Sequence, residues 1–394
     1  MNTLIKFYIE PKKVSHDQGK DFHWAIDLNR KVLQILGLWT HPKNTHQQII
    51  ASTFRPFFIC VFLTINIIIP QTLALFKVWG NLTLTVDNLI VNLPIITSQF
   101  KLFIPWFKKQ ALSNIFEDME RDWNKIKHPY ERHIMIKHAA IGKLITLCTL
   151  SIGNFCVFLY ISPIIFGNVP REINNITDNY MKVLPFQTIY FYDISKNHRY
   201  YSTLLSQIIC AFAAGSIYIS MDALFGVIVL HACGQLKILA KNIEITMNKK
   251  NCHYAWRTII QQHYQIIRFT GQIEAVFSLM LLVLFQSIIV TLCAVEFRII
   301  TVLSDSNDEI SIMHIIFDLQ FILSFIFVMF TYSWVAEYLV TQSDAIYNAV
   351  YNCEWISHNS HDTRQLMLLL MRTQFPLLLT AGKLAAVRLP TFVT

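Results

Sequence analysis

The sequence predicts an all-α membrane protein, a polytopic helical bundle with a cytosolic N-terminus. Of its 394 residues, 54% are hydrophobic and 15% are charged, and the mean hydropathy is +0.41; soluble domains carry roughly 25% charged residues. Several stretches are long and apolar enough to cross a hydrocarbon core of about 30 Å as helices. Lysine and arginine are also distributed unevenly between the segments that connect these stretches, as is typical of membrane proteins.

Six stretches are predicted to span the membrane. They cover residues 54–76, 82–106, 139–166, 203–230, 273–297 and 313–336. The fifth contains VFSLMLLVLFQSIIVTLCAV, which has no charge, and the sixth follows a single acid, Asp318. The second is the most polar, because it is interrupted by Asp87, Asn88, Asn92, Pro94 and Lys101. That stretch can span only if these groups face protein or water.

The distribution of positive charge predicts the orientation of the chain. The N-terminal segment up to residue 55 and the connections 107–143, 231–272 and 335–372 carry eight, eight, six and two Lys or Arg residues, whereas the alternate loops carry six in all. Positive loops stay in the cytosol. Both N-x-[ST] sequons, at Asn81 and Asn175, then fall outside, where glycosylation is expected. That neither is glycosylated stays an alternative, since Asn81 lies close to the membrane.

The cytosolic connections are predicted to be helical. In residues 107–137 and 231–250, apolar side chains recur at spacings of three and four, which predicts amphipathic helices that continue the bundle below the membrane. Residues 22–39 predict a further helix in the membrane interface, with Trp24 and Trp39 as anchors. We therefore expect one membrane domain with a packed cytosolic base.

No enzymatic chemistry is predicted. The sequence has no Gly-rich phosphate loop, no cysteine pair at metal spacing and no H-E-x-x-H stretch. HNSHD, residues 358–362, is interpreted as a solvated loop, because no other Cys or His cluster would complete a metal site. We expect no metal, no cofactor and no nucleic-acid partner.

Charged residues within the spans leave one alternative open. Asp87, Lys101, Asp222 and Asp318 are the kind of residue that marks a transport path. Pairing within the protein is the interpretation we favour for each. The two halves of the chain show no matching interrupted helices, which weakens the case for a secondary transporter.

Three stretches resemble insect odorant receptors, and the resemblance runs over nearly the whole chain. They are NRKVLQILGLW near the N-terminus, SMDALFGVIVLHACGQLKILAKNI, and AIYNAVYNCEW followed by RQLMLLLMRTQFPLLLTAGKL. The last is the most specific. The residues that carry it are Tyr347, Trp355, Arg364, Arg372, Gln374, Pro376, Thr380, Ala381, Gly382 and Lys383.

The resemblance implies a seven-helix, ligand-gated cation channel of four subunits, usually with a shared co-receptor, in the plasma membrane of sensory dendrites. Residues 1–50 would be a cytosolic segment, 51–336 the six-span bundle and 337–376 an anchor helix between subunits. Residues 377–394 would begin the pore helix. There LAAVRLPTFVT places Arg388 and Pro390 at unusual positions and the chain stops, so we expect a truncated seventh helix.

The resemblance also implies where a small, volatile, mostly apolar ligand binds, namely the outer half of helices two, three, four and six. Such a ligand needs an apolar, aromatic-lined cavity with one or two polar groups. Residues of suitable type share helix faces there: Phe155, Phe158, Leu159 and Ser162, then Ile208, Phe212 and Ser216, then Phe317, Asp318 and Phe321. Helix packing or lipid contact is the alternative for each. A gustatory-type receptor of the same superfamily and a transporter remain the alternatives for the chain.

Overall fold

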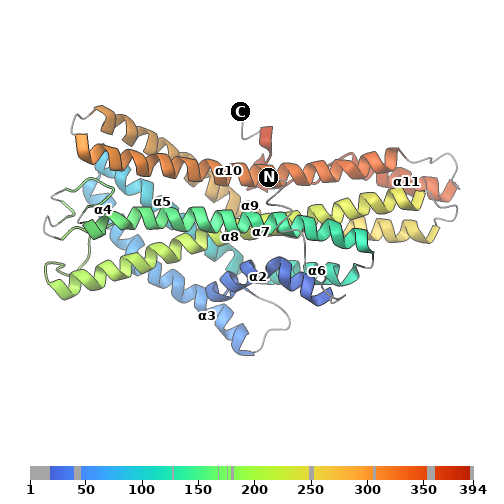
Figure 1. Cartoon of the computed structure of the whole chain (residues 1–394), viewed down its shortest axis with the longest axis horizontal. Helices are drawn as coiled ribbons and strands as arrows, with labels where there is room; N and C mark the ends of the chain where they lie inside the picture. Colours follow the sequence, from blue (N-terminus) through green and yellow to red (C-terminus); the bar gives the residue numbers. More distant parts are fainter. Residues whose placement is uncertain are drawn as a thin grey trace.

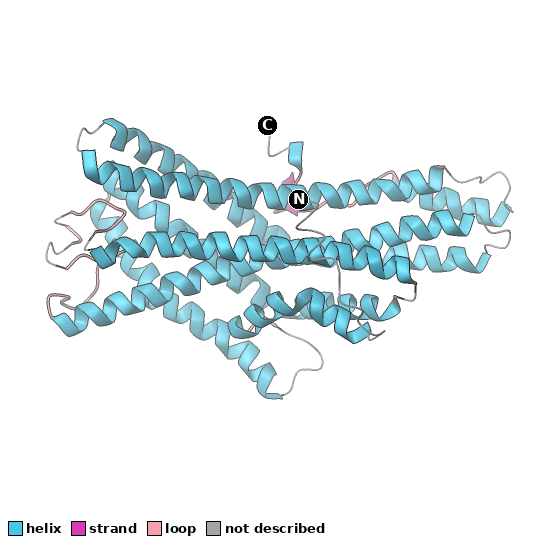
Figure 2. Cartoon of the chain, in the orientation of Figure 1, coloured by secondary structure: helices cyan, strands magenta, loops and turns pink. Residues whose placement is uncertain are grey.

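The computed structural model describes residues 18–39, 46–126, 128–166, 168–174, 176–178, 182–247, 253–304, 308–352 and 360–390. Most of these residues are helical (Figure 2). Four long helices, α7 to α10, run side by side along the long axis of the molecule (Figure 1). One end of this bundle carries the loops between α7 and α8, and the opposite end carries α11 (Figure 1).

The elements follow one another in a simple order. The first half of the chain contains α2 (Gln18–Leu36), α3 (His46–Leu63), the π-helix η1 (Thr64–Ile68), α4 (Ile69–Val78), α5 (Leu82–Phe107) and α6 (Lys109–Lys125). The chain continues with α7 (Pro129–Ile161), the 3-10 helix η2 (Ser162–Phe166), α8 (Asn197–Met247), α9 (His253–Ser304), α10 (Asp308–Tyr351) and α11 (Ser360–Thr373). Strands β1 (Thr380–Ala381) and β2 (Ala385–Ala386) pair antiparallel.

Six helical segments of the described chain are long and apolar enough to cross a membrane. They are Ser52–Val78, Leu82–Phe107, Pro129–Phe166, Asn197–Thr246, Trp256–Ser304 and Ile315–Tyr351. Each contains or closely overlaps one predicted span, including the polar second one. The prediction of six spans is therefore confirmed, and the chain is a multi-pass membrane protein.

The long helices extend well beyond the thickness of a bilayer. Helix α8 has 51 residues, which is about 77 Å at 1.5 Å per residue, compared with a hydrocarbon core of about 30 Å. Residues 231–247 therefore continue the span as predicted. Residues 337–351 likewise extend α10, so the segment predicted as one anchor helix, 337–376, contains the end of α10 and the separate helix α11.

One prediction about the connecting helices is wrong. The apolar repeat in residues 107–137 forms the amphipathic helix α6, as predicted, and the stretch then ends before α7, because Pro129 lacks an N–H and restricts the backbone of His128, which caps α7. Trp39 does not anchor the chain in the membrane interface. It is 8% exposed and stacks on Phe116 of α6 with ring centroids 4.5 Å apart.

Helices α7 and α8 approach each other closely at glycine residues. A Cβ added to Gly215 would lie 2.7 Å from the side chain of Val157, and one added to Gly234 would lie 2.8 Å from Met135 Sδ. Small residues let helix backbones approach and gain dispersion contacts in a membrane, where water supplies no hydrophobic drive. This contact fixes the distance between two walls of the cavity described below.

The Thr-Ala-Gly-Lys stretch forms the turn that joins β1 and β2. Gly382 and Lys383 both have φ of 61°, and Leu384 N–H donates to Ala381 O over 3.1 Å. The turn is held on α9, since Gly382 N–H donates to Ser278 O over 2.8 Å and Thr380 N–H donates to Glu274 Oε2 over 3.0 Å. A left-handed backbone against a helix is where glycine is needed.

Replacing Gly382 with alanine is expected to destabilise this turn. The left-handed backbone costs a residue with a Cβ about 1–2 kcal/mol, and the new Cβ would lie 2.6 Å from Leu282 Cδ2. The thermal midpoint of the purified chain should fall. Gly271→Ala on α9 is the matched control: no atom lies within 4 Å of its added Cβ, so stability should hold or rise by about 0.5–1 kcal/mol. Equal midpoints for the two variants would contradict this account of the turn.

Candidate functional site

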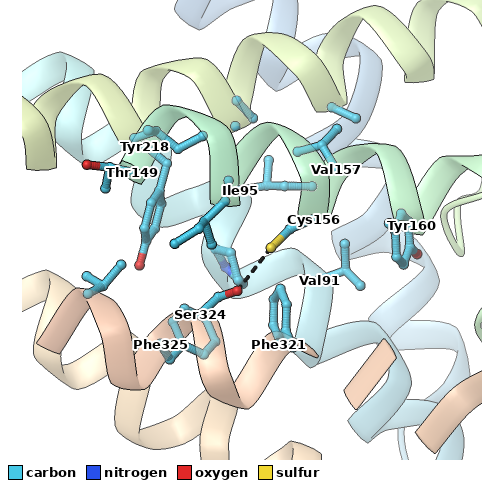
Figure 3. A pocket seen from close by; sticks show the side chains of 18 of the residues that line it. Val91, Ile95, Thr149, Cys156, Val157, Tyr160, Tyr218, Phe321, Ser324 and Phe325 are labelled. Atoms are coloured by element: carbon cyan, nitrogen blue, oxygen red, sulfur yellow. Dashed lines mark hydrogen bonds between the residues drawn. The ribbon is translucent and has the colours of Figure 1, made fainter. Parts of the chain in front are cut away.

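A cavity of about 170 Å³ lies between α5, α7, α8 and α10 (Figure 3). Its surface is almost entirely apolar. The wall includes Val91, Pro94 and Ile95 of α5, Cys156, Val157 and Tyr160 of α7, Ala211, Ala214 and Tyr218 of α8, and Phe317, Phe321, Phe325 and Val328 of α10. These four helices are the second, third, fourth and sixth spans, the set in which the ligand pocket was expected.

The structure places only part of the predicted residue set at this cavity. Phe317 and Phe321 line it. Asp318 is fully buried, in an ion pair with Arg298. The residues that do not line it are Phe155, Phe158, Leu159, Ser162, Ile208, Phe212 and Ser216. Phe155 and Phe158 are 52% and 55% exposed, because the face of α7 toward the cavity is the neighbouring one, with Cys156 and Tyr160.

Several cavity residues were missed by the sequence analysis. Tyr218 and Asp222 line the cavity from α8, four positions apart. That spacing puts two polar side chains on one face of an apolar span, a signal that could have found them. Cys156 also lines it, and its Sγ lies 3.0 Å from Ser324 Oγ (Figure 3).

A buried ion pair forms one end of the cavity. Lys101 Nζ lies 2.5 Å from Asp222 Oδ1, and Tyr332 O–H donates to the same oxygen over 2.5 Å. Lys101 is 0% exposed and its Nζ lies 3.3 Å from the ring centroid of Tyr218, a cation–π geometry. The pair joins α5, α8 and α10, so Lys101 and Asp222 are paired within the protein, as the sequence analysis favoured.

Two polar atoms at this end have no hydrogen-bond partner among the residues that the structure describes. They are Tyr218 Oη and Asp222 Oδ2, and both are buried. A buried polar atom without a partner costs about 1–3 kcal/mol. Because both residues line the cavity, a ligand with a hydrogen-bonding group can satisfy these atoms.

A second buried cluster lies beside the cavity wall. Arg298 of α9 donates from Nε to Asp318 Oδ2 over 3.0 Å and from Nη1 to Asp87 Oδ1 over 3.2 Å. Its guanidinium carbon lies 5.7 Å from the ring centroid of Phe317. Asp87 also accepts from Glu172 N–H over 2.8 Å. One arginine and two acids therefore tie α5, α9, α10 and a loop together.

The loop between α7 and α8 closes the cavity at one side. Phe186 lines it, and the loop is held by Arg171, whose two terminal nitrogens lie 2.9 and 2.6 Å from the carboxylate oxygens of Asp178. Tyr160 O–H donates to Pro185 O over 2.9 Å. Tyr190 O–H donates to Asn66 O, and burial raises the pKa of Tyr190 to about 12, so this donor keeps its proton at neutral pH.

The residues of the C-terminal match lie at the end of the bundle that carries α11 and on α9. Tyr347 stacks on Tyr351 at the end of α10, with centroids 6.0 Å apart. Arg364 and Arg372 lie on α11, and Arg372 Nη1 donates to Phe375 O over 3.2 Å. The remaining described ones lead from α11 into the turn on α9; they are Gln374, Pro376, Thr380, Ala381, Gly382 and Lys383. Trp355 lies outside the described residues.

Of the two sequons, the structure describes the asparagine of only one. Asn81 is the N-cap of α5, and its side chain accepts from Leu84 N–H over 3.3 Å while the residue is exposed. Asn175 lies outside the described residues. Glycosylation at either position stays a prediction. Within the described chain, no group of three or more His, Cys, Asp or Glu residues could hold a metal ion.

Comparison with known families settles what kind of protein has this architecture. The family model described as 7tm Odorant receptor matches residues 81–394. The chain belongs to the odorant receptor family. The gustatory and transporter alternatives are therefore set aside, and the receptor is not an enzyme.

Named relatives and solved structures agree with this assignment. The receptor is 23% identical to odorant receptor Or2 of Anopheles gambiae over 340 residues, 82% of this chain and 84% of that protein. It is 28% identical to odorant receptor 2a of Drosophila melanogaster over 153 residues, 37% of this chain and 38% of that one. Its fold matches the olfactory receptor OR5 of Machilis hrabei with a TM-score of 0.81, 16% identity and 96% of both chains covered. The complex of OR5 with eugenol matches with a TM-score of 0.78 and 15% identity, again over 96% of both chains.

Proposed function

We propose that this receptor binds a small, mostly apolar, volatile molecule in the cavity between α5, α7, α8 and α10, and that binding gates a non-selective cation channel. The observation that carries the proposal is the apolar cavity with the partnerless Tyr218 Oη and Asp222 Oδ2 at one end. An apolar wall with a few convergent polar groups is the usual form of a small-molecule site. The ligand class is then an apolar body with one hydrogen-bonding group.

Asp222 offers a route from the cavity to the rest of the bundle. Its Oδ1 holds Lys101 of α5 and Tyr332 of α10, so a ligand that pairs with Oδ2 acts on the group that joins three helices. The C-terminal part of α10 carries Glu337, which is paired with Arg388 through two contacts of 3.0 Å. We propose that this contact couples α10 to residues 377–394 as the start of the pore helix, with residues 337–376 as the anchor between subunits.

Assembly and orientation complete the proposal. We propose a heterotetramer with a shared co-receptor in the plasma membrane of sensory dendrites, with the N-terminus in the cytosol. The excess of Lys and Arg in the N-terminal segment and alternate connections supports this orientation. A glycosylation sequon inserted near Lys12 tests it, because sugar added there would place the N-terminus outside.

The function is tested by recording current from cells that express the full chain with an olfactory co-receptor. A panel of volatile compounds should include one that evokes a cation current, and cells with the co-receptor alone should not respond to it. Ligand-evoked current should be absent when the chain is expressed alone. Flux of a substrate through this chain without a partner would contradict the proposal.

Removing the Tyr218 hydroxyl is expected to weaken one class of ligand. Tyr218→Phe keeps the ring beside Lys101 and loses a hydrogen bond worth about 0.5–1.5 kcal/mol, which is about 2- to 12-fold in the half-maximal concentration. Ligands with a hydrogen-bonding group should lose this potency, whereas hydrocarbons of similar shape should not. Tyr201→Phe, 64% exposed on the same helix, is the matched control. An equal loss for hydrocarbons would show that the hydroxyl does not contact the ligand.

A further inference from the structure

A second, larger cavity lies on the membrane-facing side of the bundle, away from the odorant cavity. It is a groove of about 410 Å³ between α3 with η1 on one side and α5 on the other. Its aromatic lining residues are Phe57, Phe100, Phe103 and Trp106. Phe57, Phe100 and Phe103 are 49%, 44% and 43% exposed. Because both walls belong to membrane spans, the groove is open to the hydrocarbon.

The polar side chains inside the groove are mostly satisfied within the protein. Gln99 Nε2 donates to Cys60 O over 2.7 Å and to Thr64 Oγ1 over 2.6 Å, and Thr64 O–H donates to Cys60 O over 2.7 Å. One lining residue is different. Trp106 Nε1 is buried and has no hydrogen-bond partner in the described part of the chain. A ligand that fits the groove therefore has a long apolar part and one acceptor near Trp106.

One end of the groove is positively charged. Lys108 and Lys109 follow Trp106 directly, whereas Arg55, two positions before Phe57, lies on another face of α3 and donates from Nη1 to Gln34 O of α2 over 2.9 Å. Lys109 Nζ lies 3.4 Å from Thr53 Oγ1, so it reaches across from the α5–α6 junction to α3. The sole acid in residues 46–110 of the sequence is Asp87, which is paired with Arg298 near the other end of α5. Charge complementarity thus favours an anion at this end.

The positive charge, the tryptophan donor and the apolar groove follow one another along the chain at the end of α5. A phospholipid has its headgroup, ester groups and acyl chains in the same order. Lys108 and Lys109 come first, then the Trp106 donor, then Phe103 and Phe100 in the apolar groove. We propose that the groove binds one anionic phospholipid of the surrounding bilayer, with its headgroup at Lys109, an ester carbonyl at Trp106 Nε1 and an acyl chain along the phenylalanines. Basic pockets between spans at the cytosolic side suit anionic headgroups, and tryptophan favours the interfacial depth of the ester groups.

Photo-crosslinking of the purified full chain tests the proposal. The chain is reconstituted into phosphatidylcholine vesicles with a trace of phospholipid that carries a diazirine in its acyl chain, either phosphatidylserine or phosphatidylcholine. Mass spectrometry then locates the adducts. Phosphatidylserine should label residues 57–65 and 99–106 more than phosphatidylcholine does, by about fivefold for each cation that contributes. Equal labelling by both lipids would overturn the proposal, since it would show ordinary bilayer contact.

Two variants separate the headgroup from the groove. Lys109→Gln should lower the serine-to-choline labelling ratio by about fivefold, while Lys77→Gln, exposed at the other end of the same span, should leave it unchanged. Val61→Trp, which fills the groove, should lower labelling by both lipids severalfold. If that variant fails to elute as a monodisperse peak, Trp106→Phe replaces it, with an expected loss for both lipids. Unchanged labelling in the charge variant, or a crosslink between the α3–α5 faces of two copies, would overturn the proposal.

Discussion

Replacing Arg298 with methionine is expected to prevent the receptor from accumulating in folded form. Arg298 is 3% exposed and pairs with two acids, Asp87 and Asp318, which are 5% and 0% exposed. Without it, two buried carboxylates lose the cation that they share, and breaking a single buried pair already costs about 3–5 kcal/mol. Because most proteins are stable by only about 5–15 kcal/mol, the loss is a large part of the total. Surface expression and the monodisperse fraction in detergent measure it.

Further variants separate the charge of Arg298 from the geometry of its guanidinium. Arg298→Lys keeps one positive charge but loses the planar guanidinium that donates to both acids, so an intermediate loss of expression is expected. Arg298→Met combined with Asp87→Asn and Asp318→Asn removes every charge of the cluster and should recover part of the expression. Lys196→Met, on the exposed part of the loop, is the control for loss of a cation. Normal expression of Arg298→Met alone would show that folding does not depend on pairing these two acids with Arg298.

The Lys101–Asp222 pair gives the second large effect. Lys101→Met leaves Asp222 buried against Tyr332 without its cation, and Asp222→Asn leaves the fully buried Lys101 without its anion. Each single variant is expected to cost about 3–5 kcal/mol, whereas a double replacement of a buried pair is often near neutral. The double variant should therefore melt at a higher temperature than either single one, as measured by thermal denaturation in detergent.

A double-mutant cycle on a second ion pair of α8 supplies the reference for these thermal denaturation measurements. Lys241 and Glu244 of α8 also pair, at 2.9 Å, but they are 53% and 54% exposed. An exposed pair contributes about 0.2–1 kcal/mol at most, so the Lys241→Met and Glu244→Gln variants should melt close to the unmodified receptor and show little coupling. Similar coupling energies in the two cycles would contradict the assignment of Lys101 and Asp222 to a desolvated pair.

The spans could be predicted from sequence because they depend on a one-dimensional property. A run of about 20 apolar residues must cross the bilayer whatever its neighbours are. Even the polar second span was predicted, on the condition that its acid and its lysine face protein or water. The partner of Asp87 could not be predicted in the same way. Arg298 lies 211 positions away, and nothing local in the sequence selects it from among the other cations.

The faces of the helices could not be predicted, for a reason specific to membranes. In a helix of a soluble protein, the polar face marks the side toward water. In a membrane span, lipid and protein interior are equally apolar, so the hydrophobic pattern does not show which side of the helix faces the protein. Phe155 and Cys156 are adjacent in a uniformly apolar stretch, and their side chains face different surroundings. A better guide was present in the glycines. Gly153 and Gly215 lie where α7 and α8 touch, and both line the cavity.

The position of Asp222 limits how a receptor of this build can change its selectivity during evolution. The same carboxylate lines the cavity and holds three helices together, whereas wall residues such as Val91, Phe321 and Val328 hold no charge. Substitutions in the wall alter the shape and volume that a ligand must match at a small cost in folding. A change at Asp222 alters the preferred functional group of the ligand but also removes a buried ion pair. Descendants of such a receptor should therefore diverge first in the shape of the molecules they detect, and only later in the polar group.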